Sequence, residues 1–409
     1  MNDEDWVTGS NEALELQLVR TEDDDAILVG EDRVAVEPFH PTFTYPIFGD
    51  QEKIFGYRDL SIKLHFASGS LKQFLGISYD EKIESEDTPA DNIESELFKF
   101  IPPDYTKSSM AFEATVEADA EFTPCGEKIA SYTRAAATAK GKGKANGDAA
   151  PSQDDDNAVV FEVYHTTWDT PGFREYHRRM QVFLLLYIEG GSYIQEDEDA
   201  WEFFTLFERR KRAAGGYTYH FVGYTSVYPF WHYPDQIRLR LSQFVILPPY
   251  EHVGHGSHLY SALFEYMLGR PDVAELTVED PAEAFEDLRD RNDLRFLVKA
   301  GVPDDPLFLE GVGAEKRGSR CAWEAGLRQK YKIAQRQFDR LLEMLLLRQL
   351  DRKDPAKVRA YRLQVKSRLF RFNYEMLSTM TPDERKEALA KTYQSVVEDY
   401  DRLLKMTFH

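Results

Sequence analysis

The sequence is poor in cysteine and has no long apolar run. Cys125 and Cys321 are its only cysteines, so no disulfide framework supports the fold and we expect a reducing compartment. The longest apolar run, Val182 to Ile188, is far shorter than the roughly 20 residues that span a bilayer. The acidic start, MNDEDWVTGS, lacks the basic and apolar regions of a signal peptide. These features predict a soluble protein inside the cell without a membrane partner.

Positive charge is also scarce. Asp and Glu number 71 against 50 Lys and Arg, which gives a formal net charge of -21 over 409 residues. Direct binding of nucleic acid is therefore not expected, because phosphate contacts need clustered Lys and Arg. A basic partner fits better, although acidity can also serve solubility alone. Hydrophobic residues at 42% and aromatics at 13% are enough for two or three domains with shared interfaces.

The first part of the chain shows strand signals. Up to residue 133, short aromatic and β-branched runs alternate with Pro, Gly and Asp breaks, as in FHPTFTYPIFGDQEKIFGYRDLSIKLHF, which predicts an N-terminal α+β domain over 1–133. Residues 134–157 contain Gly, Lys and Asp but no large apolar residue. Such a segment cannot bury enough surface to fold, so we expect a disordered surface loop.

Residues 158–319 read as an α/β domain. A buried helix is predicted over about 171–189, followed by two strand-like runs, YTYHFVGYTSVYPFWHY and RLRLSQFVIL. In the second run, Leu239, Leu241 and Val245 alternate with Arg238 and Arg240, which places the two sets on opposite faces of a strand. A Gly-containing turn, a helix, the strand AELTVED and a helix opened by Pro281 follow, the order typical of an α/β domain.

The last part, 320–409, is predicted to be a helical bundle. Apolar residues recur there at spacings of three and four, the pattern of amphipathic helices. Thr381 and Glu384 form a capping box that marks the start of the last helix. The chain is therefore expected to combine α+β and α/β parts with a C-terminal helical domain.

One strand-turn-helix segment can bind an anion. The segment FVILPPYEHVGHGS, residues 244–257, predicts backbone N–H groups that point inward at a helix N-terminus, where they can hold a pyrophosphate without Lys. Gly254 and Gly256 alone are a weak signal, since many turns of this kind carry glycine for backbone reasons. His252, His255 and His258 have a spacing that a zinc site could use, but they lie in the turn and no Cys joins them, so no metal is expected.

The same segment resembles the acetyl-CoA signature of the GNAT acetyltransferases, [Gln/Arg]-x-x-Gly-x-[Gly/Ala], with Glu251 in place of the usual Gln or Arg. With its neighbours, SQFVILPPYEHVGHGSHLY and LTVEDPAEAFEDLRDRND, it is similar to the core of type B histone acetyltransferase catalytic subunits. Further similar runs are FTYPIFGDQEKIFGYRDL, HRRMQVFLLLYIEGGSYI and FDRLLEMLLL, so the resemblance covers most of the chain.

The resemblance implies a function and its partners. It implies a GNAT core that transfers acetyl from acetyl-CoA to tail lysines of free, newly made histone H-four. It also implies a WD-repeat histone-binding subunit as partner, and location in both cytoplasm and nucleus. Two other functions stay open at this point: acetylation of small amines or protein N-termini, which needs a smaller pocket, and a non-catalytic histone chaperone that uses acidity alone.

The resemblance also implies site residues. The cofactor contacts would be Phe244, Val245, Ile246, Glu251, His252, Val253, Gly254, His255, Gly256, Ser257, Ala282 and Arg291. The tail contacts would be Glu52, Lys53, Ile54, Trp201, Trp231, His232 and Tyr233. Aromatic clusters are more often core, and Arg291 has an alternative as a surface charge, so these assignments depend on the family.

The chemistry requires a base. A lysine amine is protonated at neutral pH, with a pKa of about 10.4, and cannot attack a thioester in that form. Glu279, at the end of the strand LTVED, matches the catalytic Glu of the family, and Glu189 matches a second acidic site residue. Asp280 is the neighbour of Glu279, but successive strand residues face opposite sides. We therefore expect Asp280 to cap the helix beginning at Pro281 rather than to act as the base.

Overall fold

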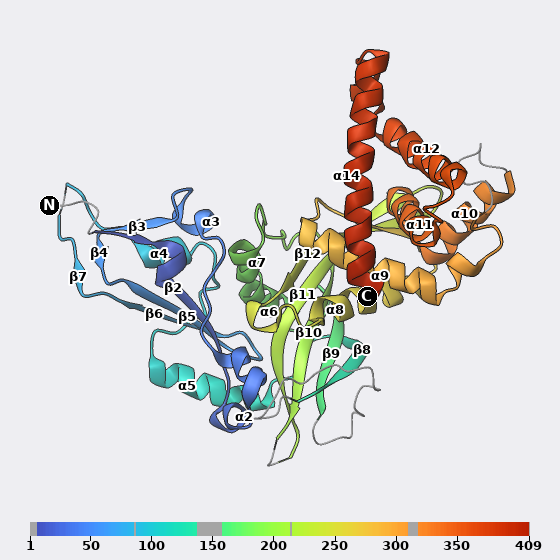
Figure 1. Ribbon diagram of the computed structural model, residues 1–409. Coiled ribbons are helices and arrows are strands. Elements are labelled where there is room, and N and C mark those ends of the chain that lie inside the picture. The colour runs from blue at the N-terminus through green and yellow to red at the C-terminus, as the bar shows by residue number, and fades with distance from the viewer. Residues whose placement is uncertain (1–5, 86, 137–157, 213–214, 310–317, 409) are drawn as a thin grey trace. The chain divides into compact units, whose positions relative to one another are not determined.

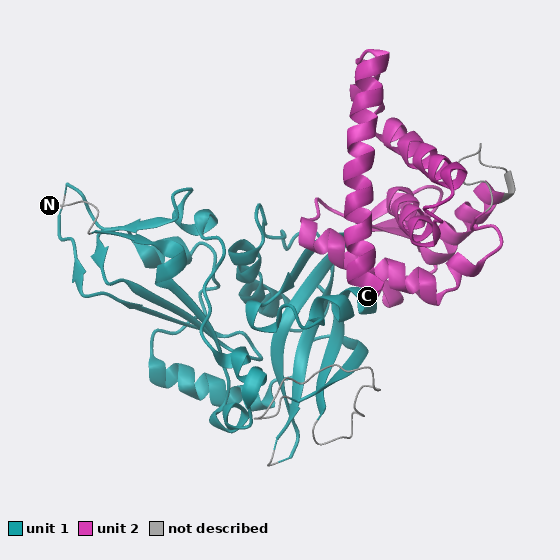
Figure 2. Cartoon of the chain, in the orientation of Figure 1, with its two compact units in different colours: residues 1–228, 241–263 teal, residues 229–240, 264–409 magenta. Residues whose placement is uncertain are grey.

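The computed structural model describes residues 6–85, 87–136, 158–212, 215–309 and 318–408. By contacts the chain forms two compact units, Met1–Tyr228 with Leu241–Leu263, and Pro229–Arg240 with Phe264–His409, shown in two colours in Figure 2. Within the described residues, no helix is both long and apolar enough to cross a membrane. The two units are groups of residues that contact one another, and they do not test the domain boundaries predicted from the sequence. Those boundaries therefore stay predictions.

The first unit begins with a three-stranded sheet in the order β2-β5-β6 (Figure 1). Strand β2 (Leu14–Val19) pairs in parallel with β5 (Ser61–Ala67), which pairs antiparallel with β6 (Gln73–Ser78). Alternate residues of β2 are buried, as a strand with one covered face requires. The smaller elements are β1 (Val7–Gly9), β3 (Lys53–Phe55), β4 (Tyr57–Arg58), β7 (Glu81–Lys82), α1 (Ser10–Ala13), α2 (Glu22–Ala26), α3 (Tyr45–Phe48), α4 (Ile93–Leu97) and α5 (Ser109–Ala118). The predicted α+β character of this region is confirmed.

A larger, six-stranded sheet has the order β13-β12-β11-β10-β9-β8, with β13 spanning Val273–Val278, and the first unit holds most of its residues. Its other strands are β8 (Glu127–Ala135), β9 (Ala158–Thr167), β10 (Glu202–Lys211), β11 (Tyr217–His232) and β12 (Gln236–Ile246). Side chains such as Phe203, Phe207 and Phe221 are fully buried against it. Strand β8 continues to Ala135, so the loop predicted from residue 134 begins later than expected. Its residues 137–157 lie outside the described part of the chain.

The helix predicted over 171–189 is two helices. They are α6 (Phe173–Met180) and α7 (Val182–Tyr187), which meet at Gln181. The N–H of Gln181 still donates to His177 O at 3.0 Å, whereas Gln181 O accepts the N–H of Leu184 at 3.0 Å. The hydrogen bonds thus change from four-residue to three-residue spacing, which ends one helix and starts the next.

In the second unit, the first half of β12 lies beside β13 (Val273–Val278), and the N–H of Ile237 donates to Asp272 O at 2.8 Å. The helices are α9 (Glu283–Lys299), α10 (Gly318–Tyr331), α11 (Gln335–Gln349), α12 (Pro355–Phe372), α13 (Tyr374–Ser378) and α14 (Pro382–Phe408). The last of these, α14, packs against α9, α11 and α12. The capping box is confirmed, because the N–H of Thr381 donates to the Glu384 carboxylate at 2.9 Å and Thr381 Oγ1 accepts the N–H of Glu384 at 3.4 Å.

Candidate active site

Strand β12 leads into the predicted cofactor turn. Val245 is 2% exposed, while its neighbours Phe244 and Ile246 are half-buried, as the two-residue period of a strand requires. The side chain of Val245 therefore belongs to the core, and only Phe244 and Ile246 present theirs on the other face. A pantetheine arm lying along this strand would meet these two side chains and the backbone of Val245.

The turn after β12 leaves its backbone uncovered. Gly254 has a φ of +98°, and a Cβ added there would meet nothing within 4 Å. Helix α8 (His255–Leu268) begins at this glycine, whose carbonyl accepts the N–H of His258 at 3.2 Å. The first N–H groups of a helix have no partner inside it and carry the positive end of the helix dipole. The turn fits the pyrophosphate of acetyl-CoA for these two reasons.

Two side chains of the turn are exposed to solvent. The His252 side chain is 94% exposed and Val253 is half-exposed. Burial raises the pKa of the Glu251 carboxyl, with His252 opposing it. Glu251 stands where the GNAT signature that the sequence resembles has Gln or Arg, so this position offers an anion no cationic side chain.

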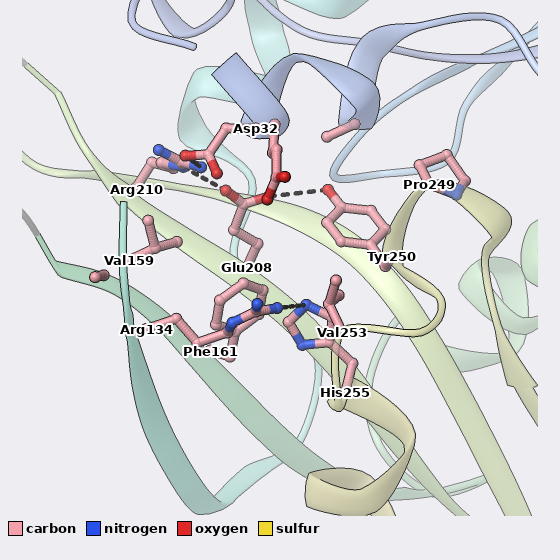
Figure 3. A pocket seen from close by; sticks show the side chains of 13 residues that line it. Asp32, Arg134, Val159, Phe161, Glu208, Arg210, Pro249, Tyr250, Val253 and His255 are labelled. Carbon is pink, nitrogen blue, oxygen red and sulfur yellow. Dashed lines mark hydrogen bonds and ion pairs between the residues drawn. The ribbon is translucent and has the colours of Figure 1, made fainter. Parts of the chain in front are cut away.

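His255 anchors the start of α8 to strand β8. The ring is buried, and its two nitrogens contact the Tyr132 hydroxyl at 2.5 Å and the Arg134 guanidinium at 3.1 Å. Figure 3 shows the contact with Arg134. Because a guanidinium can only donate, Nε2 accepts from Arg134 and Nδ1–H donates to Tyr132. Burial, followed by Arg134, lowers the pKa of His255 to about 3. The ring is neutral at physiological pH, and any cofactor contact of this residue comes from its backbone.

A buried charge network holds the other end of the turn. Glu208 on β10 accepts hydrogen bonds from Arg20 at 2.6 Å and from the Tyr250 hydroxyl at 2.9 Å, and it also pairs with Arg210. Tyr250 is the last residue of the short helix Pro248–Tyr250 that opens the turn. Figure 3 shows Glu208, Arg210 and Tyr250 on one wall of a pocket of about 90 Å³, with His255 on another. No local sequence pattern points to Arg20, Glu208 or Tyr132, because these residues lie far from the turn along the chain.

The expected base lies at the end of β13. Glu279 follows this strand directly, its side chain is 47% exposed, and its carboxylate is 3.9 Å from the guanidinium of Arg240 on β12. That guanidinium also lies over the Phe230 ring, 4.3 Å from the centroid. On the same two strands, Arg238 of β12 and Glu275 of β13 form a closer ion pair, with 2.7 Å between the nitrogen and oxygen atoms. The carboxylate of Glu279 is thus accessible to a substrate and held near one cation.

The two other acidic candidates are placed differently from expectation. Asp280 does not cap α9, because the N-cap residue is Ala282 and no side chain bonds the helix start. At Asp280 the chain instead turns through a φ of +31°, which separates it from the helix. Glu189 is exposed just after α7, so the apolar surroundings that would have suited proton transfer are missing. Of the two cofactor contacts expected in this region, Ala282, the N-cap residue of α9, is exposed, and Arg291 on α9 is half-buried with an Nε that bonds none of the described residues.

Among the expected tail contacts in the first unit, two are structural. The Glu52 carboxylate accepts the N–H groups of Thr44 at 2.7 Å and Tyr45 at 3.1 Å, and Ile54 is fully buried. Lys53 between them is exposed. Trp201 is half-buried, and its indole N–H donates to Glu198 at 2.8 Å. Lys53 and Trp201 therefore remain available to a substrate in part, whereas Glu52 and Ile54 shape the local fold.

In the second unit the aromatic contacts are open. Trp231 is 71% exposed and Tyr233 is 77% exposed, with ring centroids 6.2 Å apart in an edge-to-face arrangement. His232 between them is half-buried. Exposed aromatic pairs of this kind are unfavourable in water and are typical of binding surfaces. Within the described residues, no group of three or more His, Cys, Asp or Glu could hold a metal ion.

Comparison with known proteins agrees with this geometry. Residues 166–287, which contain β12, the turn, α8 and β13, match the acetyltransferase (GNAT) family. The fold and this match define a GNAT acetyltransferase, a class that uses acetyl-CoA. Residues 6–189 match histone acetyl transferase HAT1 N-terminus, and residues 290–351 match fungal HAT1, C-terminal.

Relatives that match over nearly the full length identify the family within the GNAT acetyltransferases. A histone acetyltransferase type B catalytic subunit from Cryptococcus neoformans is 65% identical over 99% of both chains. Those from Mycosarcoma maydis and Mus musculus are 46% and 30% identical, over 91% and 98% of this chain and 84% and 94% of their own. The chain belongs to the family of type B histone acetyltransferase catalytic subunits, and it is a histone acetyltransferase. A solved aminoglycoside acetyltransferase from a soil metagenomic sample covers 34% of this chain and 86% of its own at 13% identity, but its TM-score of 0.22 carries no argument.

The open turn predicts a specific effect at Gly254. We expect Gly254→Ala to weaken acetyl-CoA binding about 5- to 100-fold, because a Cβ at a φ of +98° costs roughly 1–3 kcal/mol of strain that the turn relieves by moving. Gly172→Ala is the matched control, since Gly172 has a φ of +77° and equal open space but lies outside the turn. Calorimetry should show weakened binding for the first variant only. Equal affinities for both variants would exclude the turn as the pyrophosphate site.

Proposed function

We propose that this histone acetyltransferase modifies tail lysines of free, newly made histone H-four by direct transfer in a ternary complex. In this scheme Glu279, directly or through water, takes the proton from the lysine ammonium. The neutral amine then attacks the thioester carbon of acetyl-CoA, the C–S bond breaks, and CoA leaves as a thiolate. No acyl-enzyme is formed. The observation that carries the scheme is an accessible carboxylate at the end of β13, next to the strand that matches the cofactor signature.

The substrate class rests on surface chemistry. A histone tail alternates Gly with Lys and needs flat contact surfaces with negative charge. The exposed rings of Trp231 and Tyr233 supply such a surface, and a net charge of -21 attracts a basic chain. Free core histones are therefore the proposed protein partners, together with a WD-repeat histone-binding subunit as in the family resemblance, in both cytoplasm and nucleus.

Mass spectrometry tests the substrate. A mixture of free core histones and assembled nucleosomes is incubated with acetyl-CoA and the full chain. The proposal expects acetylation of H-four tail lysines in free histones and little in nucleosomes. Preferential modification of another histone, or of nucleosomes, would contradict the proposed specificity without affecting membership of the family.

Salt should change the Michaelis constants of the two substrates to different extents. We expect the Michaelis constant for a tail peptide to rise with ionic strength, because exposed charges are screened beyond about 8 Å at physiological salt. The constant for acetyl-CoA should change less, since backbone N–H groups of the turn bind it. Steady-state kinetics over a salt series measure both. If neither constant responds to salt, attraction between the acidic protein and the tail is not part of binding.

Loss of the contact between Arg240 and Glu279 should change kcat by a small factor. We expect Arg240→Gln to lower kcat about two- to fivefold, because the lost pair is partly exposed and worth at most about 1 kcal/mol. Arg238→Gln is the matched control: it breaks a pair on the same two strands, at 2.7 Å with Glu275, and should leave kcat unchanged. Initial rates at saturating acetyl-CoA measure the difference. Equal losses in both variants would point to damage of the strand pair instead of the base.

A further inference from the structure

Helix α12 is the most basic element in the described part of this acidic protein. Its sequence, PAKVRAYRLQVKSRLFRF, contains six Lys and Arg and no Asp or Glu, whereas the whole chain has a net charge of -21. The helix packs on α14 in the second unit, and Figure 1 shows the two helices in red. Charge of this sign so concentrated in one helix requires a physical explanation.

Part of the charge serves the fold. Arg368 pairs with the buried Glu343 carboxylate at 2.8 Å. Lys357 lies 3.7 Å from Asp354, the residue that caps the same helix. These two cations therefore have partners within the helical domain and do not define a binding surface.

Of the four remaining cations, Arg371 lies on the opposite side of the helix, and the other three form a group. Arg359, Arg362 and Lys366, here called the α12 cationic stripe, form no ion pair with any acidic side chain that the structure describes. Their spacing of three and four residues puts them on one side of the helix. Arg359 and Arg362 are exposed and Lys366 is half-buried. The stripe is thus open to solvent and unneutralised by its surroundings.

The stripe is also mutually repulsive. Arg362 and Lys366 are four residues apart, a spacing at which like charges destabilise a helix. Burial, and then Arg362, lower the pKa of the Lys366 ammonium. Lys366 contacts the ring of Tyr393 on α14, with Nζ 5.9 Å from the centroid. The arrangement therefore does not serve the stability of the isolated chain, and an anionic partner would relieve it.

Apolar side chains lie within and beyond the stripe. Leu363, four residues after Arg359, is 48% exposed. After the end of α12, Tyr374 is 58% exposed and Met376 is 55% exposed. A ligand that covers this surface must therefore offer apolar groups as well as negative charge. A simple phosphate or other small anion would leave these side chains in water.

We propose that the α12 cationic stripe is a docking surface for an acidic protein segment that carries apolar residues. The stripe spans eight residues of helix, about 10 Å for seven rises of ~1.5 Å, which a short peptide matches. Duplex nucleic acid is longer and would carry its phosphates into the field of a protein with a net charge of -21, which opposes binding. The stripe shares no residue with the turn and does not include Glu279, and the proposal is independent of the proposed histone specificity.

Fluorescence anisotropy tests the proposal with the full chain. The probe is a labelled peptide of Glu with Leu at every fourth position, and a labelled DNA duplex of similar charge is the second probe. The variant Arg359→Gln with Lys366→Gln removes two charges from the stripe. Its matched control, Lys357→Gln with Arg371→Gln, removes two charges from the far side of the same helix. Circular dichroism and acetyl transfer to histones verify that both variants are folded.

The expected result is peptide binding that the stripe variant weakens roughly three- to thirtyfold, as two exposed ion pairs allow, and that the control variant changes less than twofold. Binding should also fall with salt. Three outcomes overturn the proposal: no peptide binding at low salt, equal weakening by both variants, or tighter binding of the duplex than of the peptide. The last outcome would assign the surface to nucleic acid.

Discussion

Glu279→Gln should lower turnover by roughly 10²- to 10⁴-fold while acetyl-CoA affinity stays unchanged, the usual contribution of a positioned general base. Gln keeps the size and hydrogen bonding of the side chain but cannot accept the amine proton. The residual rate should therefore rise with pH, as more of the lysine substrate is already neutral. Single-turnover rates across a pH series, with calorimetry for acetyl-CoA, measure both effects.

Asp280→Asn is the matched control for this prediction. Asp280 neither caps α9 nor lies in β13, and its φ of +31° is one that Asn tolerates as well as Asp. We expect near-normal turnover and stability for this variant. Near-normal turnover of Glu279→Gln, combined with loss of activity in Asp280→Asn or Glu189→Gln at intact acetyl-CoA affinity, would show that the base is misassigned.

Arg20→Met should destabilise the protein by roughly 3–5 kcal/mol, because it removes one of the two cations that pair with the buried Glu208 carboxylate. Arg20 and Glu208 are both buried and 2.6 Å apart. Arg33→Met is the matched control, since Arg33 pairs with Asp25 at 3.4 Å on the surface and should cost at most about 1 kcal/mol. Urea unfolding curves measure both free energies. Equal small losses would mean that the buried pair contributes no more than a surface pair.

The same network predicts sensitivity to acid. Burial alone would raise the pKa of Glu208, but Arg20 and Arg210 outweigh it and hold this pKa well below its usual 4.5. A carboxyl with a depressed folded pKa contributes stability above its unfolded pKa and loses it as the pH falls toward the folded value. Wild-type stability should therefore fall below about pH 4.5, and Arg20→Met should show a shallower fall. The cofactor turn is affected too, because Tyr250 bonds the same carboxylate.

Local patterns along the chain predicted the elements that depend on local physics. The alternation of Leu239, Leu241 and Val245 predicted β12 correctly, because a strand with one covered face must repeat every two residues. The Thr381 capping box predicted the start of α14 for a similar local reason. The resemblance predicted the family, and the full-length relatives confirmed it.

Features that depend on distant residues or on backbone detail could not be predicted in this way. Tyr132 and His255 are 123 residues apart, and nothing in either local sequence signals their contact. The apolar run Val182–Ile188 did not predict the change of hydrogen-bond spacing at Gln181, because hydrophobicity does not depend on which backbone hydrogen bonds a helix forms. Asp280 was expected to cap a helix because Asp is common there, but the chain turns at Asp280 and begins α9 three residues later.

The last helix also determines how far this chain can be shortened. Arg402 of α14 holds Asp287 of α9 at 2.7 Å, and Tyr400 donates to the buried Glu343 carboxylate of α11 at 3.0 Å. Helix α9 carries Ala282 at its start and Arg291 in its middle. Trimming the chain before Tyr400, a common step in making a smaller version for expression, would remove both contacts, one of them with α9, the helix that carries Arg291, which we expect to contact the cofactor. A carboxyl-terminal fusion partner should therefore be attached through a linker that leaves the final turns of α14 in place.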